Sequence, residues 1–213
     1  MKLYTYWRSG AAYRIRIALN LKGVPYTPVP VDLLHGEHRK PRYAKVNPAK
    51  LVPTLELTDG ERLTQSLAIL DYLDRTYPRP AFLPHDPVAR AHIMAAGMTI
   101  AVDTHPIQNL SVMAHVRDDL GHGKAGAFAW QHRWMTRGFD AFEALVRKDT
   151  KFAFGEAPGY ADICLIPQVY NARRWKLDLS PWPRITAIEA ACLALPAFDA
   201  ARPENQPDAV EDG

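Results

Sequence analysis

The spacing of apolar residues changes several times between residues 1 and 80, and each change predicts a different element. Large side chains alternate in "KLYTYW" (2–7), which predicts a short strand. The next stretch, "GAAYRIRIALNLK" (10–22), has the spacing of a helix, and Gly23 after it is a typical helix stop. A second strand is predicted over 26–33, and its prolines favour a place at the edge of a sheet.

The rest of this region predicts a loop, a hairpin and a third helix. Residues 35–50 are polar and rich in stop signals, which predicts a loop with a short irregular helix. Two short strands over 52–57 and 62–66 are separated by a turn that contains Asp-Gly. A helix follows from Ser66 to Pro78. The resulting order, strand–helix–strand–helix–strand–strand–helix, is typical of a thioredoxin-like α/β domain.

A change of composition marks the end of this first domain. Residues 78–87 hold four of the 18 prolines of the chain, which predicts a linker. Strand signals are absent after it, and helical spacing predicts an all-α C-terminal domain with helices over 88–118, 124–148, 160–175 and 183–195. Pro106 is expected to kink or interrupt the first of these helices. The polar residues 201–213 contain prolines and are expected to form a loosely held tail. The predicted domains are 1–80 and 87–207.

Composition and charge narrow the class of protein. The 213 residues are 47% hydrophobic and 23% charged, which favours a globular protein with a sizeable core. No apolar run approaches the roughly 18 to 20 residues of a membrane span, and the opening "MKLYTYW" lacks a signal-peptide core, so we expect a cytoplasmic protein. The net charge of +3 is dispersed, without the basic stripe that a nucleic-acid-binding protein usually has. Cys164, Cys192 and the histidines lack metal-ligand spacing, so we expect buried thiols and no metal site.

The junction between the first strand and the first helix is the first candidate site. Arg8 and Ser9 precede the small residues Gly10 and Ala11 where the helix begins. The first turn of a helix carries N–H groups without intrahelical partners and a partial positive charge, and small side chains let a ligand approach its backbone. A hydroxyl donor at such a place suits a thiolate. The alternative is that Ser9 is an ordinary N-cap.

Two further positions carry weaker signals of the same kind. Pro53 opens a strand, which a cis peptide bond would explain, and the backbone of Val52 could then pair with a peptide-like ligand. Gln65 and Ser66 begin a helix and offer polar groups that suit a carboxylate. An edge-strand proline and a plain N-cap are the respective alternatives.

Taken in order, these signals resemble the zeta class of glutathione transferases, which includes maleylacetoacetate and maleylpyruvate isomerases. The resemblance covers residues 1 to 207 and lies in the stretches "YWRSGAAYRIRIAL", "NPAKLVPTL", "QSLAILDYL", "HPIQNLSV" and "NARRWKLDLSPWPRI". It implies the glutathione transferase fold, glutathione as cofactor and a homodimer. Many zeta enzymes have Ser-Ser-Cys at the first helix start, where this chain has Ser9, Gly10 and Ala11. Gly159 stands where the fold usually has a hydroxyl cap, and Asp162 keeps its place.

The resemblance also implies roles for individual residues. Ser9 would activate the thiol of glutathione, while Arg8 and Arg174 would bind substrate carboxylates or an enolate oxygen; neighbouring Arg173 would point elsewhere. His105 would contact glutathione or shuttle a proton, or would be a structural histidine. The implied glutathione-binding residues are Ser9, Gly10, Ala11, His38, Lys50, Val52, Pro53, Gln65, Ser66, His105, Gln108 and Asn109.

The function implied by the resemblance is cis–trans isomerisation of maleylpyruvate or maleylacetoacetate by reversible thiolate addition. The substrate would be a small dicarboxylic keto-acid, and glutathione would be regenerated. Two alternatives stay open from the sequence. One is a transferase or dehalogenase that consumes glutathione on small electrophilic acids, and the other is a non-catalytic binding protein of the same fold.

Overall fold

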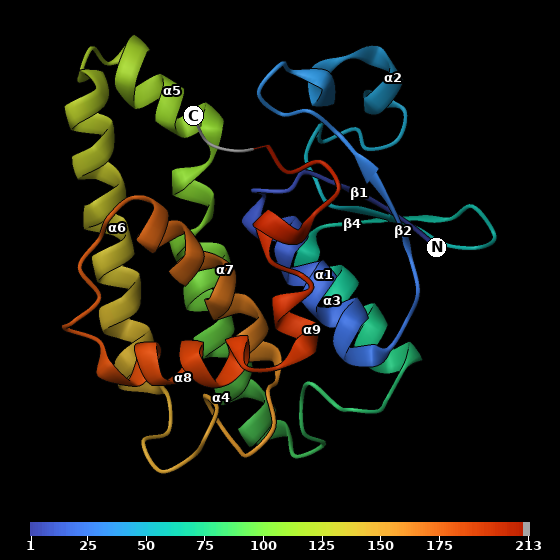
Figure 1. The fold of residues 1–213 in the computed structure, drawn as a ribbon, viewed down its shortest axis with the longest axis vertical. Coiled ribbons are helices and arrows are strands. Elements are labelled where there is room, and N and C mark those ends of the chain that lie inside the picture. Colours follow the sequence, from blue (N-terminus) through green and yellow to red (C-terminus); the bar gives the residue numbers. More distant parts are fainter. Residues whose placement is uncertain (211–213) are drawn as a thin grey trace. The chain divides into compact units, whose positions relative to one another are not determined.

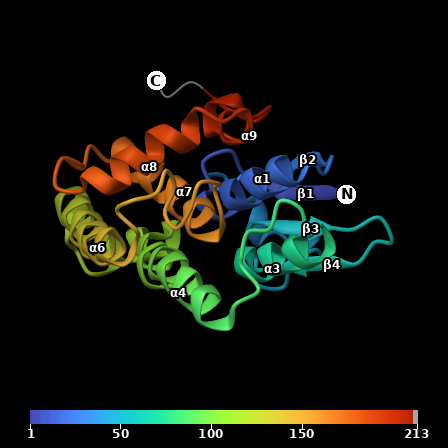
Figure 2. The same cartoon turned by 90° about the horizontal axis from the view of Figure 1, so that it is seen from below.

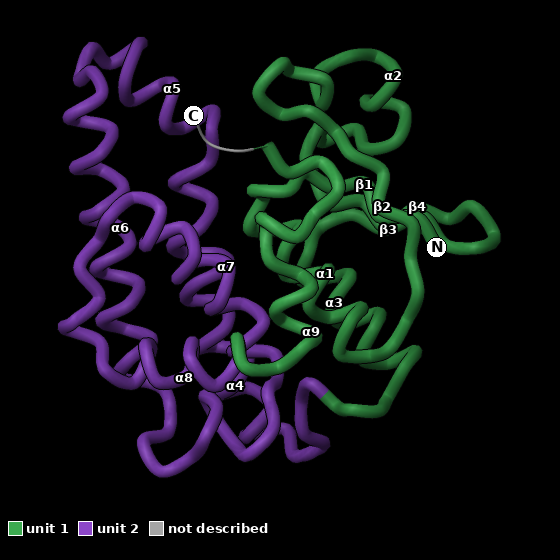
Figure 3. Tube along the Cα trace, viewed as in Figure 1, with its two compact units in different colours: residues 1–81, 193–213 green, residues 82–192 purple. Residues whose placement is uncertain are grey.

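The computed structural model describes residues 1–210, and the chain forms two compact units (Figure 3). Unit 1 contains Met1–Ala81 together with the described chain from Leu193 onward, and unit 2 contains Phe82–Cys192. Unit 1 is an α/β unit and unit 2 is helical, so the predicted fold class is confirmed. The sequence assigns residues 193–207 to the helical domain, whereas the structure packs them with unit 1.

A mixed four-stranded sheet forms the centre of unit 1 (Figure 1). Its strand order is β2–β1–β3–β4, with β1 parallel to β2 and antiparallel to β3. β2 lies at an edge, as its prolines predict, because a proline cannot donate to an inner ladder. The strands are β1 (Lys2–Thr5), β2 (Thr27–Pro30), β3 (Thr54–Glu56) and β4 (Arg62–Thr64).

Two helices of unit 1, α1 (Gly10–Lys22) and α3 (Ser66–Thr76), lie side by side (Figures 1 and 2). α1 ends where predicted, because Gly23 takes the left-handed conformation of a C-cap at φ 64°. The predicted loop with a short irregular helix contains the 3₁₀ turn η1 (Glu37–Arg39) and the short helix α2 (Pro41–Ala44).

The prediction of a loosely held C-terminal tail is wrong for the part of the tail that the structure describes. After the short helix α9 (Pro196–Asp199), the chain packs against unit 1, and Ala201 is fully buried. Its carbonyl accepts a hydrogen bond of 3.0 Å from Nε of Arg16, which is also fully buried. Burying a charged guanidinium is costly unless its N–H groups have hydrogen-bond acceptors, and the C-terminal segment provides one of them. Residues 211–213 lie outside the described part.

Unit 2 consists of helices, as predicted. A helix was expected over 88–118 with an interruption at Pro106, and the structure confirms the interruption: a π-helical stretch, η2 (Thr99–Thr104), gives way to a 3₁₀ turn, η3 (Pro106–Gln108). No helix within residues 1–210 has the length and apolar character to cross a bilayer. The α-helices of this region are α4 (Pro87–Met98), α5 (Leu110–Ala114), α6 (Gly123–Leu145), α7 (Tyr160–Arg174) and α8 (Pro183–Leu193).

Candidate active site

Strand register brings the candidate residues of unit 1 to one end of the sheet. Thr54, the first residue of β3, pairs with Tyr4 near the end of β1 and with Thr64 at the end of β4. The segments that follow β1, precede β3 and follow β4 therefore leave the sheet at the same end. These are the segments that carry Ser9, Pro53 and Ser66.

Ser9 caps α1 in a way that leaves its hydroxyl proton available. Its backbone is extended, and its Oγ accepts a hydrogen bond of 3.2 Å from the N–H of Ala12. An oxygen that accepts from the backbone can still donate its own proton. The half-buried Gly10 and Ala11 contribute the first N–H groups of the helix beside it. The capping interpretation and the thiolate-binding interpretation are thus compatible in one geometry.

A buried arginine that the sequence analysis missed fixes the loop before Ser9. Nη1 of Arg16 donates to Thr5 Oγ1 at 3.1 Å, and its Nη2 donates to the carbonyl of Trp7 at 2.9 Å. Trp7 also donates its N–H to Asp208 Oδ2 at 2.9 Å. Arg8, which is half-buried, follows this loop, with its guanidinium carbon 4.5 Å from the centre of the Trp7 ring.

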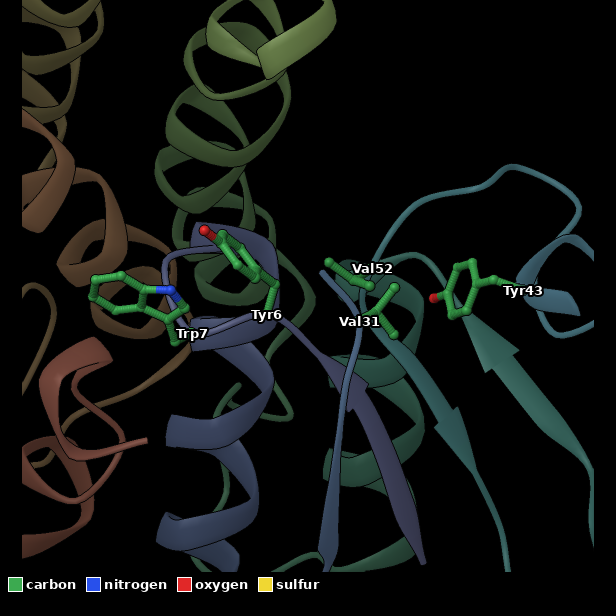
Figure 4. Close-up of a cluster of buried hydrophobic side chains, with 5 residues drawn as sticks. All are labelled: Tyr6, Trp7, Val31, Tyr43 and Val52. Atoms are coloured by element: carbon green, nitrogen blue, oxygen red, sulfur yellow. The ribbon is translucent and has the colours of Figure 1, made fainter. Parts of the chain in front are cut away.

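The Val52–Pro53 peptide bond is cis, as predicted. Within the described chain, the backbone N–H and C=O of Val52 form no hydrogen bond. Its buried side chain belongs to an apolar cluster at the end of the sheet (Figure 4), whose members are Tyr6, Trp7, Val31, Tyr43 and Val52. The side chain is therefore anchored, while the polar backbone of the same residue has no partner within the described chain.

Two further residues without a sequence signal hold the segment before Pro53. The carbonyl of Leu51 accepts from the hydroxyl of Tyr43 at 2.8 Å and from Nδ2 of Asn47 at 2.7 Å. Asn47 is buried and also accepts the N–H of Ala49 at 2.9 Å. Lys50, in the same segment, is exposed and has a positive φ of 56°.

The start of α3 combines an unusual backbone with a buried arginine. Gln65 is exposed and has φ 65°, a value that non-glycine residues rarely adopt and that costs about 1–3 kcal/mol. Ser66, the next residue, is buried and accepts a hydrogen bond of 3.2 Å from Nη1 of Arg14. The sequence analysis missed Arg14, which brings positive charge to a helix N-terminus that already favours an anion.

His38 is a half-buried histidine in η1. Burial is the main cause that lowers its pKa, and the charge of Arg39 lowers it further, so the ring is neutral near neutral pH. Its Nδ1 is buried and has no hydrogen-bond partner among the described residues. Such an atom is left for a ligand or water to satisfy.

In unit 2, the interruption of the helix at Pro106 places His105 and Asn109 around a short turn. Both side chains are half-buried, and the N–H of Asn109 donates to the carbonyl of Pro106 at 3.2 Å. Trp130 steadies the turn, because its indole N–H donates to the carbonyl of Ile107 at 2.8 Å. Gln108, in contrast, is buried, and its amide oxygen accepts from two residues of α7. Contacts of these residues with glutathione stay predictions.

The two arginines at the end of α7 have different surroundings. Arg173 forms a two-point ion pair with Glu189 of α8, in which Nε lies 2.7 Å from Oε1. Arg174 is exposed, lies with its guanidinium carbon 5.0 Å from the centre of the Trp175 ring, and donates to Asn171 Oδ1 at 3.2 Å. The two side chains thus have different partners, and the assignment of Arg174 to the substrate stays a prediction.

The departure from the usual cap of α7 has a steric reason. A Cβ atom added at Gly159 would lie 2.8 Å from the carbonyl oxygen of Phe82, so the site has no room for a serine or threonine. Asp162 still completes the cap by accepting the N–H of Gly159 at 2.9 Å. Burial raises the pKa of the Asp162 carboxyl to about 6, although this hydrogen bond and another from Ala153 oppose the rise.

Other reactive side chains offer no alternative centre. Cys164 and Cys192 are buried thiols, as expected, and burial raises the pKa of the Cys192 thiol strongly. Across residues 1–210, no three His, Cys, Asp or Glu side chains cluster as metal ligands would.

Family models match a large part of each unit. The model "Glutathione S-transferase, N-terminal domain" matches residues 3–81, and "Glutathione S-transferase, C-terminal domain" matches residues 129–191. The chain belongs to the glutathione S-transferase family. A maleylacetoacetate isomerase from Rhizobium meliloti (strain 1021) is 47% identical to it over 205 residues, which are 95% of this chain and 96% of that protein.

Solved glutathione S-transferases cover nearly the whole chain. A structure of maleyl pyruvate isomerase, a bacterial zeta-class member, has a TM-score of 0.96 and 45% identity, with 99% of this chain and 100% of that one covered. A maleylacetoacetate isomerase from Anaeromyxobacter dehalogenans 2CP-1, solved with GSH in its active site, has a TM-score of 0.89 and 41% identity, with coverage of 98% and 97%. The predicted resemblance to the zeta class is confirmed.

Proposed function

We propose that the protein is a glutathione-dependent cis–trans isomerase that converts maleylpyruvate or maleylacetoacetate into the fumaryl product. The observation that carries the proposal is the cap of α1, where the hydroxyl of Ser9 accepts a backbone N–H and keeps its own proton to donate. The full-length similarity to isomerases supports the reaction type. Both substrates carry two carboxylates, and they differ from each other in the length of the keto chain.

The residues of unit 1 fit glutathione from end to end. The tripeptide backbone pairs with the N–H and C=O of Val52, which form no hydrogen bond within the described chain. The γ-glutamyl carboxylate binds at the start of α3, beside Gln65 and Ser66. His38 donates or accepts through its buried Nδ1, and Lys50 supplies a cation.

Activation of the sulfur falls to the start of α1. When bound, glutathione supplies the thiolate that adds reversibly to the maleyl double bond. Ser9 donates a hydrogen bond from its hydroxyl to the sulfur, and the N–H groups of Gly10 and Ala11 add positive potential. Both effects lower the pKa of a thiol. The second hydroxyl and the cysteine of the Ser-Ser-Cys variant are therefore not required.

The substrate is an anion, and two arginines of the chain are assigned to it. Arg8 precedes the cap residue, and Arg174 presents a guanidinium at the end of α7. A planar guanidinium can bind both oxygens of a carboxylate, or stabilise the oxygen that becomes negative as the thiolate adds. His105 and Asn109, at the turn near Pro106, are assigned to glutathione, and His105 is also a candidate proton shuttle.

A single assay separates this function from its alternatives. The ultraviolet absorbance of maleylpyruvate is followed with purified protein, with and without glutathione, while free thiol is titrated. We expect conversion to fumarylpyruvate that requires glutathione and consumes none. Loss of thiol in proportion to turnover on a haloacid would establish a transferase instead, and glutathione binding without any turnover would establish a binding protein.

Assembly and location follow from the same proposal. We assign the protein to the cytoplasm, where its two buried thiols stay reduced. We also assign it a homodimeric state, which the resemblance to the zeta class implies. Light scattering coupled to size-exclusion chromatography measures the mass, and a monomer would contradict the assignment.

A further inference from the structure

Gln108 is a buried amide that connects two segments of unit 2. Its Nε2 donates to the carbonyl of Thr104 at 2.8 Å. Its Oε1 accepts from Gln168 Nε2 at 3.1 Å and from Asn171 Nδ2 at 3.2 Å. The amide therefore bonds to the segment that contains Pro106 and to the buried side of α7.

The hydrogen bonds continue from Gln108 to Arg174 in one direction. Nη2 of Arg174 donates to Asn171 Oδ1, Asn171 Nδ2 donates to Gln108 Oε1, and Gln108 Nε2 donates to the Thr104 carbonyl. An amide oxygen only accepts and an amide nitrogen only donates. A turned Asn171 amide would bring two donors together at Arg174 and two acceptors together at Gln108, so the guanidinium and Gln108 jointly fix its orientation.

The spacing along α7 explains how a buried glutamine reaches an exposed arginine. Gln168, Asn171 and Arg174 are three residues apart, and side chains at this spacing are neighbours on a helix surface. At 3.6 residues per turn each step rotates by about 60°, so the row winds around the helix. The three side chains are accordingly buried, half-buried and exposed.

We propose that Gln108 and Asn171 are positioning residues that hold the Arg174 guanidinium in place for a substrate carboxylate. The inference rests on the proposed function, in which Arg174 binds substrate. An unrestrained arginine loses rotamer freedom when it binds a ligand, and a guanidinium already held on one edge loses less of it. Gln108 thus acts through Arg174 and makes no contact with the reacting atoms.

A double-mutant cycle tests this coupling. Asn171→Ala, Gln108→Met and Arg174→Met are made singly, and the first two are also each combined with Arg174→Met. The kinetics of maleylpyruvate isomerisation are measured with purified, full-length protein at saturating glutathione. We expect Arg174→Met to lower kcat/KM about a hundredfold, and Asn171→Ala and Gln108→Met about tenfold each, mainly through the KM of maleylpyruvate. In the Arg174→Met background the same two changes should cost less than twofold.

Controls distinguish positioning from general damage. Gln131→Met removes another buried glutamine of unit 2, on α6, and should leave kcat/KM within twofold of the wild type. The KM of glutathione should not change in the Asn171→Ala variant. Asn171→Ala alters a half-buried position, so it keeps the test valid if Gln108→Met fails to fold.

The possible outcomes distinguish a failure of the positioning role from a failure of the proposed function. If Asn171→Ala or Gln108→Met lowers kcat/KM by the same factor in the Arg174→Met background as in the wild type, the positioning role is overturned. The proposed isomerase function would not be affected by that result. A wild-type protein without isomerase activity would instead refute the proposed function. An Arg174→Met variant with unchanged kinetics would refute the role of Arg174, and with it the positioning role.

Discussion

The guanidinium of Arg14 donates a hydrogen bond of 3.2 Å to the hydroxyl of Ser66, and only 2% and 7% of these two residues is exposed. The bond joins α1 to the first turn of α3. It occupies one acceptor position of the hydroxyl and so directs the hydroxyl proton away from the arginine. It also adds a full positive charge to the partial positive charge of the helix start.

We expect Arg14→Met to weaken glutathione binding. The KM of glutathione should rise about tenfold, because a hydrogen bond to a charged group contributes about 1.5 kcal/mol or more. The kcat at saturating glutathione should change little, since the reacting atoms are untouched. Steady-state kinetics and titration calorimetry with glutathione measure both quantities.

Two variants control this measurement. Arg75→Met removes an exposed arginine of α3 that pairs with Asp71, and it should leave the KM of glutathione unchanged. Ser66→Ala removes the same buried hydrogen bond with a smaller change of volume, and should raise the KM as well. An unaltered KM in folded Arg14→Met protein would show that the arginine is purely structural.

Ser9→Ala should raise the pKa of the glutathione thiol in the complex. The substitution removes the hydroxyl that donates to sulfur, and it also removes the cap on Ala12. The cap alone should cost about 1 kcal/mol of stability. The ultraviolet absorbance of the thiolate, followed against pH with bound glutathione, reports the thiol pKa directly.

The matched control is Ser9→Thr, which keeps both the cap and the donor. It should retain the low thiol pKa, while Ser9→Ala loses it. If the two variants titrate alike, the backbone N–H groups of α1 activate the sulfur without help from the hydroxyl.

Much of the fold could be predicted because its signals are local. The end of α1 at Gly23 and the break at Pro106 depend on the conformational limits of single residue types. The described C-terminal chain could not be predicted in this way. One of the bonds that hold it joins the carbonyl of Ala201 to Arg16, and every residue has a carbonyl, so the composition gives no sign of this contact.

The residues of the candidate site also divide into those that have a local sequence signal and those that only the folded chain brings into place. Ser9, Pro53 and Ser66 stand at element boundaries, where caps and prolines have recognisable patterns. Arg14 and Ser66 are 52 residues apart, and only the folded chain brings them together. The positive φ of Gln65 had no signal, since a glutamine does not favour that conformation and tertiary contacts must impose it.

Arg16→Met should destabilise unit 1 strongly. The guanidinium is fully buried and donates to Thr5, Trp7 and Ala201, and all these acceptors would lose their partner at once. Buried groups left unsatisfied cost about 1–3 kcal/mol each, so we expect a loss of roughly 3 kcal/mol or more in the free energy of unfolding. Urea denaturation measures it.

Arg202→Met is the comparison for this variant. Within residues 1–210, the ion pairs of the Arg202 side chain are both long, at 3.7 Å to Asp199 and 3.6 Å to Glu204, and such pairs contribute at most about 1 kcal/mol each. The two variants should therefore differ clearly in their urea midpoints. An Arg16→Met protein within about 1 kcal/mol of the wild type would mean that water replaces the guanidinium at its acceptors.

The carboxylate of Glu56 on β3 should make stability depend on pH in the acid range. It accepts hydrogen bonds from Lys2 at 2.8 Å, from Arg62 at 2.9 Å and from the hydroxyl of Tyr4 at 3.2 Å. The hydrogen bonds from Lys2 and Arg62 are the main causes that lower the pKa of Glu56 from 4.5 to about 2. The folded protein therefore holds this proton less tightly than the unfolded chain does.

The sign of the effect follows from that difference. The stabilising contribution of Glu56 is complete above pH 4.5 and is lost as the pH falls towards 2. Glu56→Gln should lower the Tm at pH 7, and the gap to the wild type should narrow between pH 4.5 and pH 2. Circular dichroism melts over this range measure the gap, with Glu61→Gln as an exposed control on the same hairpin. A gap that stays constant with pH would mean that Glu56 stabilises β3 by packing and not by its charge.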